Sequence, residues 1–184
     1  MDTIGDAYVV VGGLSGVTEQ NVRNVVLRMV EVAAGMNQIL AEYRDQSGHD
    51  IQMRIGIHRG PAIAGVVGQM KPRFHVFGKT IEYTNKLESD GLKSRIHVSK
   101  VIAQDIYKYY NIVHRYDETE TIVSEQELIG DATFLIKSKV DQSRYKKAKS
   151  TQNNVQHDHW CLGYIIAEHP RLIACCIHIA PNIA

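Results

Sequence analysis

The sequence predicts an α+β fold in which helices pack against a mixed or antiparallel sheet. Apolar residues recur every three or four positions over residues 22–43, which is typical of an amphipathic helix. The stretch "IQMRIGIHRG", residues 51–60, alternates apolar and polar side chains, which predicts a strand. Several strand-like segments also follow one another without an intervening helix. Together these patterns favour α+β over a doubly wound fold.

The chain opens on "MDTIGDAYVVVGGL", where Gly5 and Asp6 separate two short apolar runs, residues 3–4 and 8–11. The second run is β-branched and aromatic and ends at a pair of glycines, which indicates a strand. We therefore predict a hairpin with its turn at Gly5 and Asp6. From these residues alone, Asp6 is either a solvated turn residue or a metal ligand.

The helix predicted over residues 22–43 follows Thr18 and is stopped by Ser47 and Gly48. The apolar positions of the strand that follows fall on one face, so Arg54 points away from the core. Farther along we expect apolar glycine-bounded segments at 61–68 and 74–78, a helix at 79–89, a strand at 95–99, a helix at 100–110 capped by Ser99, and a last strand at 132–136.

The character of the chain changes after residue 136. Residues 137–156 are polar and basic with almost no periodicity, which is typical of a linker or a disordered stretch. Residues 157–184 are apolar again and form a tail of unknown role, either an extra packed helix or sequence foreign to the domain. We therefore expect one domain over residues 1–136, followed by a linker and a tail.

Composition limits the partners and the setting. The 184 residues are 44% hydrophobic and carry a net charge of +1, so one core is expected and nucleic acid is not an expected partner. No apolar run approaches the ~18 to 20 residues of a membrane span. The three cysteines lie together in the last quarter and do not describe a disulfide framework. We expect a cytoplasmic domain, with any membrane anchor of its parent outside this chain.

Four segments identify a family by resemblance. Their order and spacing resemble those of class III adenylate and guanylate cyclase catalytic domains. The segments are "TIGDAYVVVGGL", "MRIGIHRGPAIAGVVG", "KPRFHVFGKTIEYTNKLES" and "RIHVS". The resemblance covers residues 1–136. It implies a ferredoxin-like core that acts as a head-to-tail dimer, converting GTP or ATP to a 3′,5′-cyclic nucleotide and pyrophosphate in the cleft between two halves.

The resemblance also implies roles for individual residues. Two family aspartates hold two Mg²⁺ or Mn²⁺ ions, and the second lies in the "GDAY" turn, at Asp6 beside Gly5. The first lies in an upstream "Asp-Ile-x-Gly-Phe-Thr" stretch, so we expect a truncated domain that is inactive alone. Arg54, in "MRIGIH", matches an arginine that contacts phosphate. Without the resemblance, a solvated or salt-bridged arginine is the alternative.

Departures from the family pattern indicate which half this chain resembles. Glu82 and Lys86 stand where the half that stabilises the transition state has a catalytic asparagine and arginine. "YTNKLES" resembles instead the metal-bearing half of heterodimeric cyclases, such as the α subunit of soluble guanylate cyclase. No lysine occurs between residues 118 and 135, where the other half carries a "Lys-Gly-Lys-Gly" stretch. We therefore expect the metal-bearing half of an asymmetric dimer, with a second cyclase half-domain as partner.

The choice of purine stays open. The family's base-reading positions hold Asp2 and His75, which match neither the guanine nor the adenine set. "PRFHVFG" resembles guanylate-type sequences more than adenylate-type ones, so GTP is favoured over ATP. The departures at Asp2, His75, Glu82 and Lys86 also leave an alternative, a non-catalytic cyclase-like module for regulation or dimerisation.

Overall fold

The computed structural model describes residues 2–4, 7–14, 18, 20–128, 130–140 and 167–181. Its core is an eight-stranded sheet with the order β1-β2-β8-β3-β5-β7-β6, and β4 pairs with β3 off this path. β3 and β5 are parallel, whereas the other pairs are antiparallel. The sheet is therefore mixed, and the predicted α+β fold is confirmed.

The predicted N-terminal hairpin is confirmed by the pairing of its two strands. β1 (Asp2–Ile4) and β2 (Ala7–Gly12) are antiparallel, with Thr3 opposite Tyr8 and Ile4 opposite Ala7. This register leaves a connection of two residues, which are Gly5 and Asp6. Both lie outside the described residues, so the predicted role of Asp6 stays a prediction.

Helix α1 (Val22–Ser47) covers one face of the sheet. It ends as predicted at Gly48, which takes a left-handed conformation (φ 69°) and donates its N–H to the carbonyl of Arg44. Val26, Val30 and Ala33 on its inner face are fully buried in the main hydrophobic core. None of the helices in the described part of the chain is long and apolar enough to cross a membrane.

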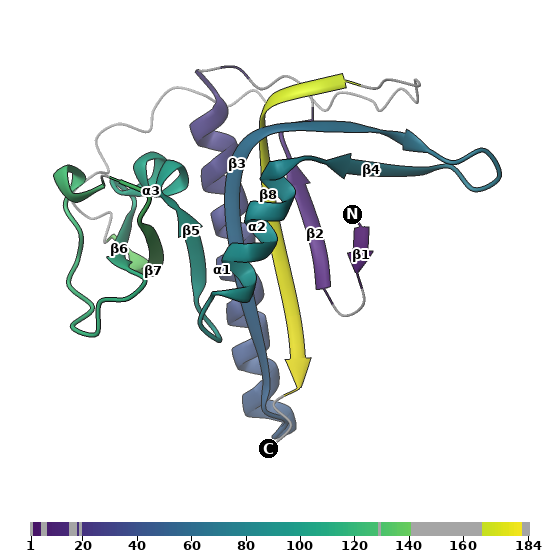
Figure 1. Ribbon diagram of the computed structural model, residues 1–184. Coiled ribbons are helices and arrows are strands. Elements are labelled where there is room, and N and C mark those ends of the chain that lie inside the picture. Colours follow the sequence, from purple (N-terminus) through teal and green to yellow (C-terminus); the bar gives the residue numbers. More distant parts are fainter. Residues whose placement is uncertain are drawn as a thin grey trace, which may run out of the picture.

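Strand β3 (Ile51–Val67) is longer than predicted. The two segments expected at 51–60 and 61–68 form one continuous strand, with a register shift between Gly60 and Ala62 in its pairing with β8. A bulge of this kind bends a strand without ending it. Gly60 and Pro61 lie at this bulge, and in the sequence they resemble the end of a strand. The far end of β3 and strand β4 (Arg73–Phe77) form a hairpin arm that extends away from the rest of the sheet (Figure 1).

Helix α2 (Lys79–Ser89) lies across β3 on the face opposite α1 (Figure 1), with the bounds that the sequence predicts. Gly56 of β3 allows the close approach of this helix. A Cβ atom at Gly56 would lie 2.4 Å from the Glu88 nitrogen and 2.6 Å from the Thr84 oxygen. Both neighbours are backbone atoms, so they cannot rotate away as a side chain would.

The second half of the sheet contains β5 (Ile96–Ser99), α3 (Lys100–Ile106), β6 (Tyr110–His114), a short 3₁₀ turn η1 (Glu125–Glu127) and β7 (Thr133–Lys139). The helix predicted over 100–110 was too long. It ends at Ile106 because Tyr110 begins an edge strand, where its side chain is 4% exposed. β7 continues to Lys139, so residues 137–139 are strand although we expected a linker there.

The tail contains a strand where the sequence suggested a packed helix or foreign sequence. β8 (Ala167–Pro181) lies between β2 and β3 and is antiparallel to both (Figure 1). The helix alternative is therefore wrong for this range, and 132–136 is not the last strand. A short apolar run fits a strand or a buried helix equally well, so the sequence of this segment did not distinguish the two.

Candidate functional site

Polar side chains gather on the face of the sheet that α2 covers. The buried polar residues of the described chain are Thr80, Thr84, Glu88, His97 and Ser99. Three of them come from α2, and the other two from β5, beside β3. Buried polar groups are costly unless they are hydrogen-bonded, so such a concentration indicates a polar site.

Arg54 of β3 forms an ion pair with Glu88 of α2. Its Nε donates to Glu88 Oε1 at 2.8 Å, and the side chains are 33% and 8% exposed, respectively. Arg54 thus points away from the apolar core, as predicted. Sequence reasoning missed Glu88, although the four-residue spacing of Thr80, Thr84 and Glu88 already places them on one helix face.

His58 belongs to the same polar face. Its Nδ1 lies 2.8 Å from Ser99 Oγ, and its ring centroid lies 4.6 Å from that of Tyr83. Burial, with a smaller effect of the neighbouring Arg59 charge, lowers the pKa of His58 to about 4, so the imidazole is neutral at pH 7. Ser99 occupies the position before α3 as predicted, but its side chain makes no cap hydrogen bond there and contacts His58 instead.

A cavity of about 540 Å³ opens between the end of α2, β5 and the segments around β6 and β7. It is lined by Tyr83, Lys86, Leu87, Asp90, His97, His114, Arg115, Tyr116, Asp117, Asp131, Ala132 and Thr133. Lys86 is the predicted site residue found here. Three carboxylates, those of Asp90, Asp117 and Asp131, share the wall with the two cations Lys86 and Arg115.

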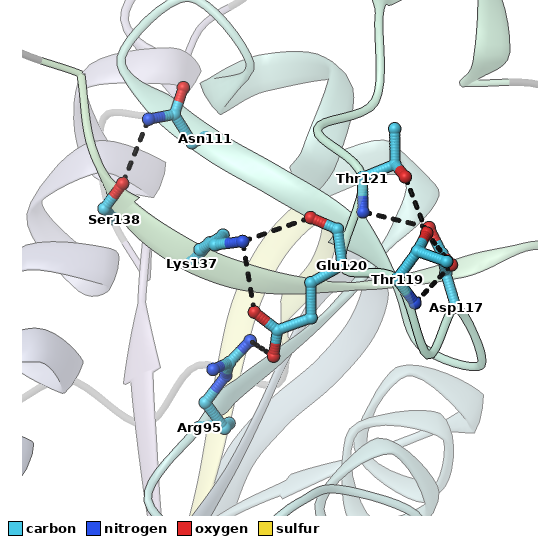
Figure 2. Close-up of polar contacts among 8 residues, drawn as sticks. All are labelled: Arg95, Asn111, Asp117, Thr119, Glu120, Thr121, Lys137 and Ser138. Atoms are coloured by element: carbon cyan, nitrogen blue, oxygen red, sulfur yellow. Dashed lines mark hydrogen bonds and ion pairs between the residues drawn. The ribbon is translucent and has the colours of Figure 1, made fainter.

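Two of these charged residues also hold the cavity wall together. Arg115 donates from Nε to the Asp90 carbonyl at 2.8 Å. Asp117 accepts the backbone N–H groups of Thr119 at 2.9 Å and Thr121 at 3.0 Å, which closes a tight turn (Figure 2). The hydroxyl of Thr119, which also donates to this carboxylate, lowers the pKa of Asp117 most, and the two backbone hydrogen bonds add to the effect, so the carboxyl stays ionised.

The adjacent Glu120 anchors this loop to the sheet. Its carboxylate pairs with Arg95 at 3.0 Å and with Lys137 at 3.2 Å (Figure 2). Glu120 also has a positive φ of 48°, which is uncommon for a residue other than glycine. The loop therefore holds a defined conformation at the edge of the cavity.

The remaining predicted residues are spread over the sheet and α2. Glu82 is exposed in the first turn of α2. His75 is half-buried in β4, with its ring 5.7 Å from that of Phe77. Asp2 lies in β1 opposite Val9. The structure does not bring these three together with Lys86 in one cavity, because the described lining residues do not include them.

Arg54 lies in the same row of the sheet as the end of the N-terminal hairpin. Ala7, which follows Asp6 in the sequence, and Arg54 are both paired with His178 of β8. Neighbouring strands are about 4.8 Å apart, so two such spacings separate Ala7 from Arg54 by about 10 Å. The predicted phosphate contact and the strand that leads out of the predicted metal turn are thus near each other.

The metal prediction has no counterpart among the residues that the structure describes. They contain no group of three or more histidine, cysteine, aspartate or glutamate side chains that could hold an ion. Asp6 lies outside them, and hard divalent ions such as Mg²⁺ require several oxygen ligands. The described residues by themselves therefore do not form the expected metal site.

Comparison with known proteins decides the family. The sequence model of one family, described as the adenylate and guanylate cyclase catalytic domain, matches residues 1–121. The chain belongs to this family. The resemblance found in its sequence motifs is thereby confirmed.

Relatives of the cyclase chain are guanylate cyclases. It is 39% identical over 117 residues to guanylate cyclase soluble subunit beta-2 of Rattus norvegicus, which covers 62% of this chain and 17% of that protein. It is 41% identical over 101 residues to atrial natriuretic peptide receptor 2 of Homo sapiens, covering 54% of this chain and 9% of that protein. The chain thus spans less than a fifth of the length of these curated relatives.

Two solved cyclase structures share the fold. One is the catalytic core of a rhodopsin-guanylyl cyclase with converted specificity, in complex with ATPαS, at a TM-score of 0.53 and 22% identity over 70% of this chain and 64% of that chain. The other is the guanylate cyclase domain of RhGC from Catenaria anguillulae in complex with GTP. Its TM-score is 0.51 and its identity is 19%, and the match covers 70% of this chain and 65% of that chain. These likenesses establish the α+β fold of cyclase catalytic cores.

The cavity joins two positions that the cyclase resemblance singled out separately. From the resemblance, we expect Lys86 at the position of the transition-state arginine, and Asp131 belongs to the lysine-free stretch of residues 118–135. The structure places both in one cavity wall. The carboxylates of Asp90, Asp117 and Asp131 therefore lie in the same wall as Lys86.

Proposed function

We propose that this chain is part of a nucleotidyl cyclase catalytic domain and serves as the metal-bearing half of an asymmetric dimer. The observation that carries the proposal is the cavity at Lys86, where Asp90, Asp117 and Asp131 outnumber the cations. A nucleoside triphosphate is highly anionic, and three carboxylates repel it in a confined site. This half therefore does not build its own transition-state site and depends on a partner half-domain.

The proposed reaction forms a bond between the ribose 3′ oxygen and the α-phosphorus, releases pyrophosphate and loses the proton of the 3′ hydroxyl. Catalysis of such a transfer consists of positioning and of stabilising negative charge. Arg54 contacts a phosphate oxygen in this proposal, and Glu88 holds the guanidinium in place. Asp6 serves as a carboxylate ligand for Mg²⁺ or Mn²⁺, which is the cofactor that the family resemblance implies.

GTP is the proposed substrate, with ATP as the alternative. The motif "PRFHVFG" resembles guanylate-type sequences, and the relatives named above carry guanylate cyclase or natriuretic receptor names. The product would be cyclic GMP, formed in the cytoplasm for intracellular signalling.

An exposed apolar surface on the hairpin arm supports a partner half-domain. Five large apolar side chains of β3, β4 and their connection are exposed, and Met70 is 96% exposed. They are Ile63, Val67, Met70, Phe74 and Phe77. Apolar patches of this kind on a soluble domain mark interaction sites. The arm projects away from the rest of the sheet (Figure 1), so its exposed side chains are available to a second domain.

The test uses this chain fused to an upstream segment that carries the family's "Asp-Ile-x-Gly-Phe-Thr" stretch, mixed with a cyclase half that carries the asparagine, arginine and lysine of the transition-state set. We expect cyclic GMP formation with Mn²⁺-GTP from the pair and none from the 184-residue chain alone. Asp6→Ala should lower turnover by about a hundredfold or more, since it removes a metal ligand. Asp45→Ala, at an exposed position of α1, is the matched control. Unchanged turnover in Asp6→Ala would contradict the proposal.

The second candidate is a non-catalytic cyclase-like module that binds and regulates a partner domain. The exposed Glu82 and the carboxylates beside Lys86 favour it, because both depart from the catalytic pattern. It predicts that the pair associates in sedimentation experiments but never turns over GTP or ATP. Robust turnover by the pair would exclude it.

A further inference from the structure

A buried ring nitrogen in the wall of the cavity at the end of α2 has no hydrogen-bond partner among the described residues. His97 of β5 is 1% exposed and forms part of the cavity wall. Its Nδ1 lies 2.6 Å from the Leu87 carbonyl, and a carbonyl can only accept, so Nδ1 carries the hydrogen. Nε2 is then an acceptor, and it has no hydrogen-bond partner in the described part of the chain.

An unpaired buried acceptor is costly unless a ligand or a water satisfies it. The pKa of His97 is lowered, mainly by burial, so the ring stays neutral and Nε2 keeps its lone pair. Arg115 and Asp90 also act on this pKa, and both line the same cavity. The histidine therefore offers an acceptor beside one positive and one negative group of the wall.

Charges of both signs are available on this wall. Among the described residues, the ammonium of Lys86 and the carboxylates of Asp90 and Asp131 make no hydrogen bond or ion pair, and Arg115 uses only Nε of its guanidinium. Asp117 is engaged by its own turn. A purely anionic ligand would meet Asp90 and Asp131, and a purely cationic one would meet Lys86 and Arg115. A zwitterion meets opposite charge on both sides.

We propose that this cavity binds a small α-amino carboxylate. The ammonium group supplies the N–H donor that His97 Nε2 lacks and pairs with Asp131 or Asp90, while the carboxylate pairs with Lys86 or Arg115. Leu87, Ala132 and the ring of Tyr83 provide apolar lining for an uncharged side chain. The inference does not depend on the proposed cyclase activity, because it concerns binding by this chain alone.

The experiment follows the His97 Nε2 resonance of the ¹⁵N-labelled full chain by NMR during titration with L-leucine. Two probes each lack one charge: 4-methylpentanoate has no ammonium group, and 3-methylbutylamine has no carboxylate. We expect a saturable shift with L-leucine and at least about tenfold weaker binding of either single-charge probe, because each loses a charge-assisted hydrogen bond.

Variants of exposed residues then locate the site without disturbing the core. Asp131→Asn and Lys86→Gln should each weaken L-leucine binding by about tenfold. Asp45→Asn on α1 and Lys71→Gln on the hairpin arm are the matched controls and should bind as the unchanged chain does. The proposal is overturned if L-leucine gives no saturable shift, if a single-charge probe binds equally well, or if both cavity variants keep full affinity.

Discussion

The two faces of strand β3 differ in chemistry although their residues alternate along one strand. Met53, Ile55 and Ile57 are at most 1% exposed and pack in the core with α1 and α3. Between them, Arg54 pairs with Glu88, and His58 contacts Ser99 on the α2 side. Successive side chains of a strand point to opposite faces, so one segment serves two environments. The α1 face stabilises the fold by apolar burial, whereas the α2 face holds ionisable groups in place.

The largest effect is expected on the apolar face. Ile57→Ala should lower the free energy of unfolding by about 2–5 kcal/mol, because it leaves a cavity at a fully buried position. Ile63→Ala, on the same strand but 44% exposed, is the control and should change stability far less. Urea denaturation measures both. Equal losses would show that the α1 face is not the main source of stability.

Gly56→Ala tests how closely the α2 face is packed. Its new Cβ would meet the backbone of α2 at 2.4 Å, so we expect a loss of about 1–3 kcal/mol and a displaced helix. Gly35→Ala in α1 is the matched control. Beyond its chain neighbours and the backbone of its own helix, no described atom lies within 4 Å of its added Cβ, and replacing a helical glycine should stabilise by about 1 kcal/mol at most. Loss of stability in both variants would contradict this explanation.

Acid should destabilise the polar face selectively. The pKa of His58 is about 4 in the folded chain, below the ordinary histidine value of 6.5. Between these two values the unfolded chain binds a proton that the folded chain does not, so stability falls as the pH falls from 6.5 towards 4. The slope from one such group is at most about 1.4 kcal/mol per pH unit.

The measurement is a urea denaturation series over this pH range, compared with His58→Gln. The variant should lose part of the slope, and the remainder includes His97, whose pKa is also lowered by burial. An identical slope in the variant would show that His58 is not the titrating group.

The smallest effect is expected for the ion pair of Arg54 and Glu88. A double-mutant cycle with Arg54→Gln and Glu88→Gln should give a coupling of about 1 kcal/mol, because Glu88 is buried and Arg54 only partly so. Lys139 and Glu31 form the control pair, with side chains 52% and 57% exposed. Their coupling should be close to zero. Equal couplings would mean that the α2 face does not hold Arg54 in a special environment.

Local patterns predicted the elements whose signals lie within a few residues. The hairpin flanks around Gly5 and Asp6, the end of α1 at Gly48 and the bounds of α2 all follow from turn residues or helical spacing. The four motifs also predicted the family, because each is a short segment and only their order had to match. The predictions failed where a residue's environment overrode its local signal, as at Ser99, which contacts His58 and makes no cap hydrogen bond.

Residue identity and order therefore established the family, helices α1 and α2, and the face on which Arg54 lies. Folding alone brought Glu88 to Arg54, 34 positions away, and placed Lys86, His97 and Asp131 in one cavity wall. Folding also put β8, from the far end of the sequence, between β2 and β3. These contacts join segments that are distant along the chain, and no periodicity or turn signal within a segment encodes which distant segment it will meet. Packing of the sheet and of α2 against it decides them.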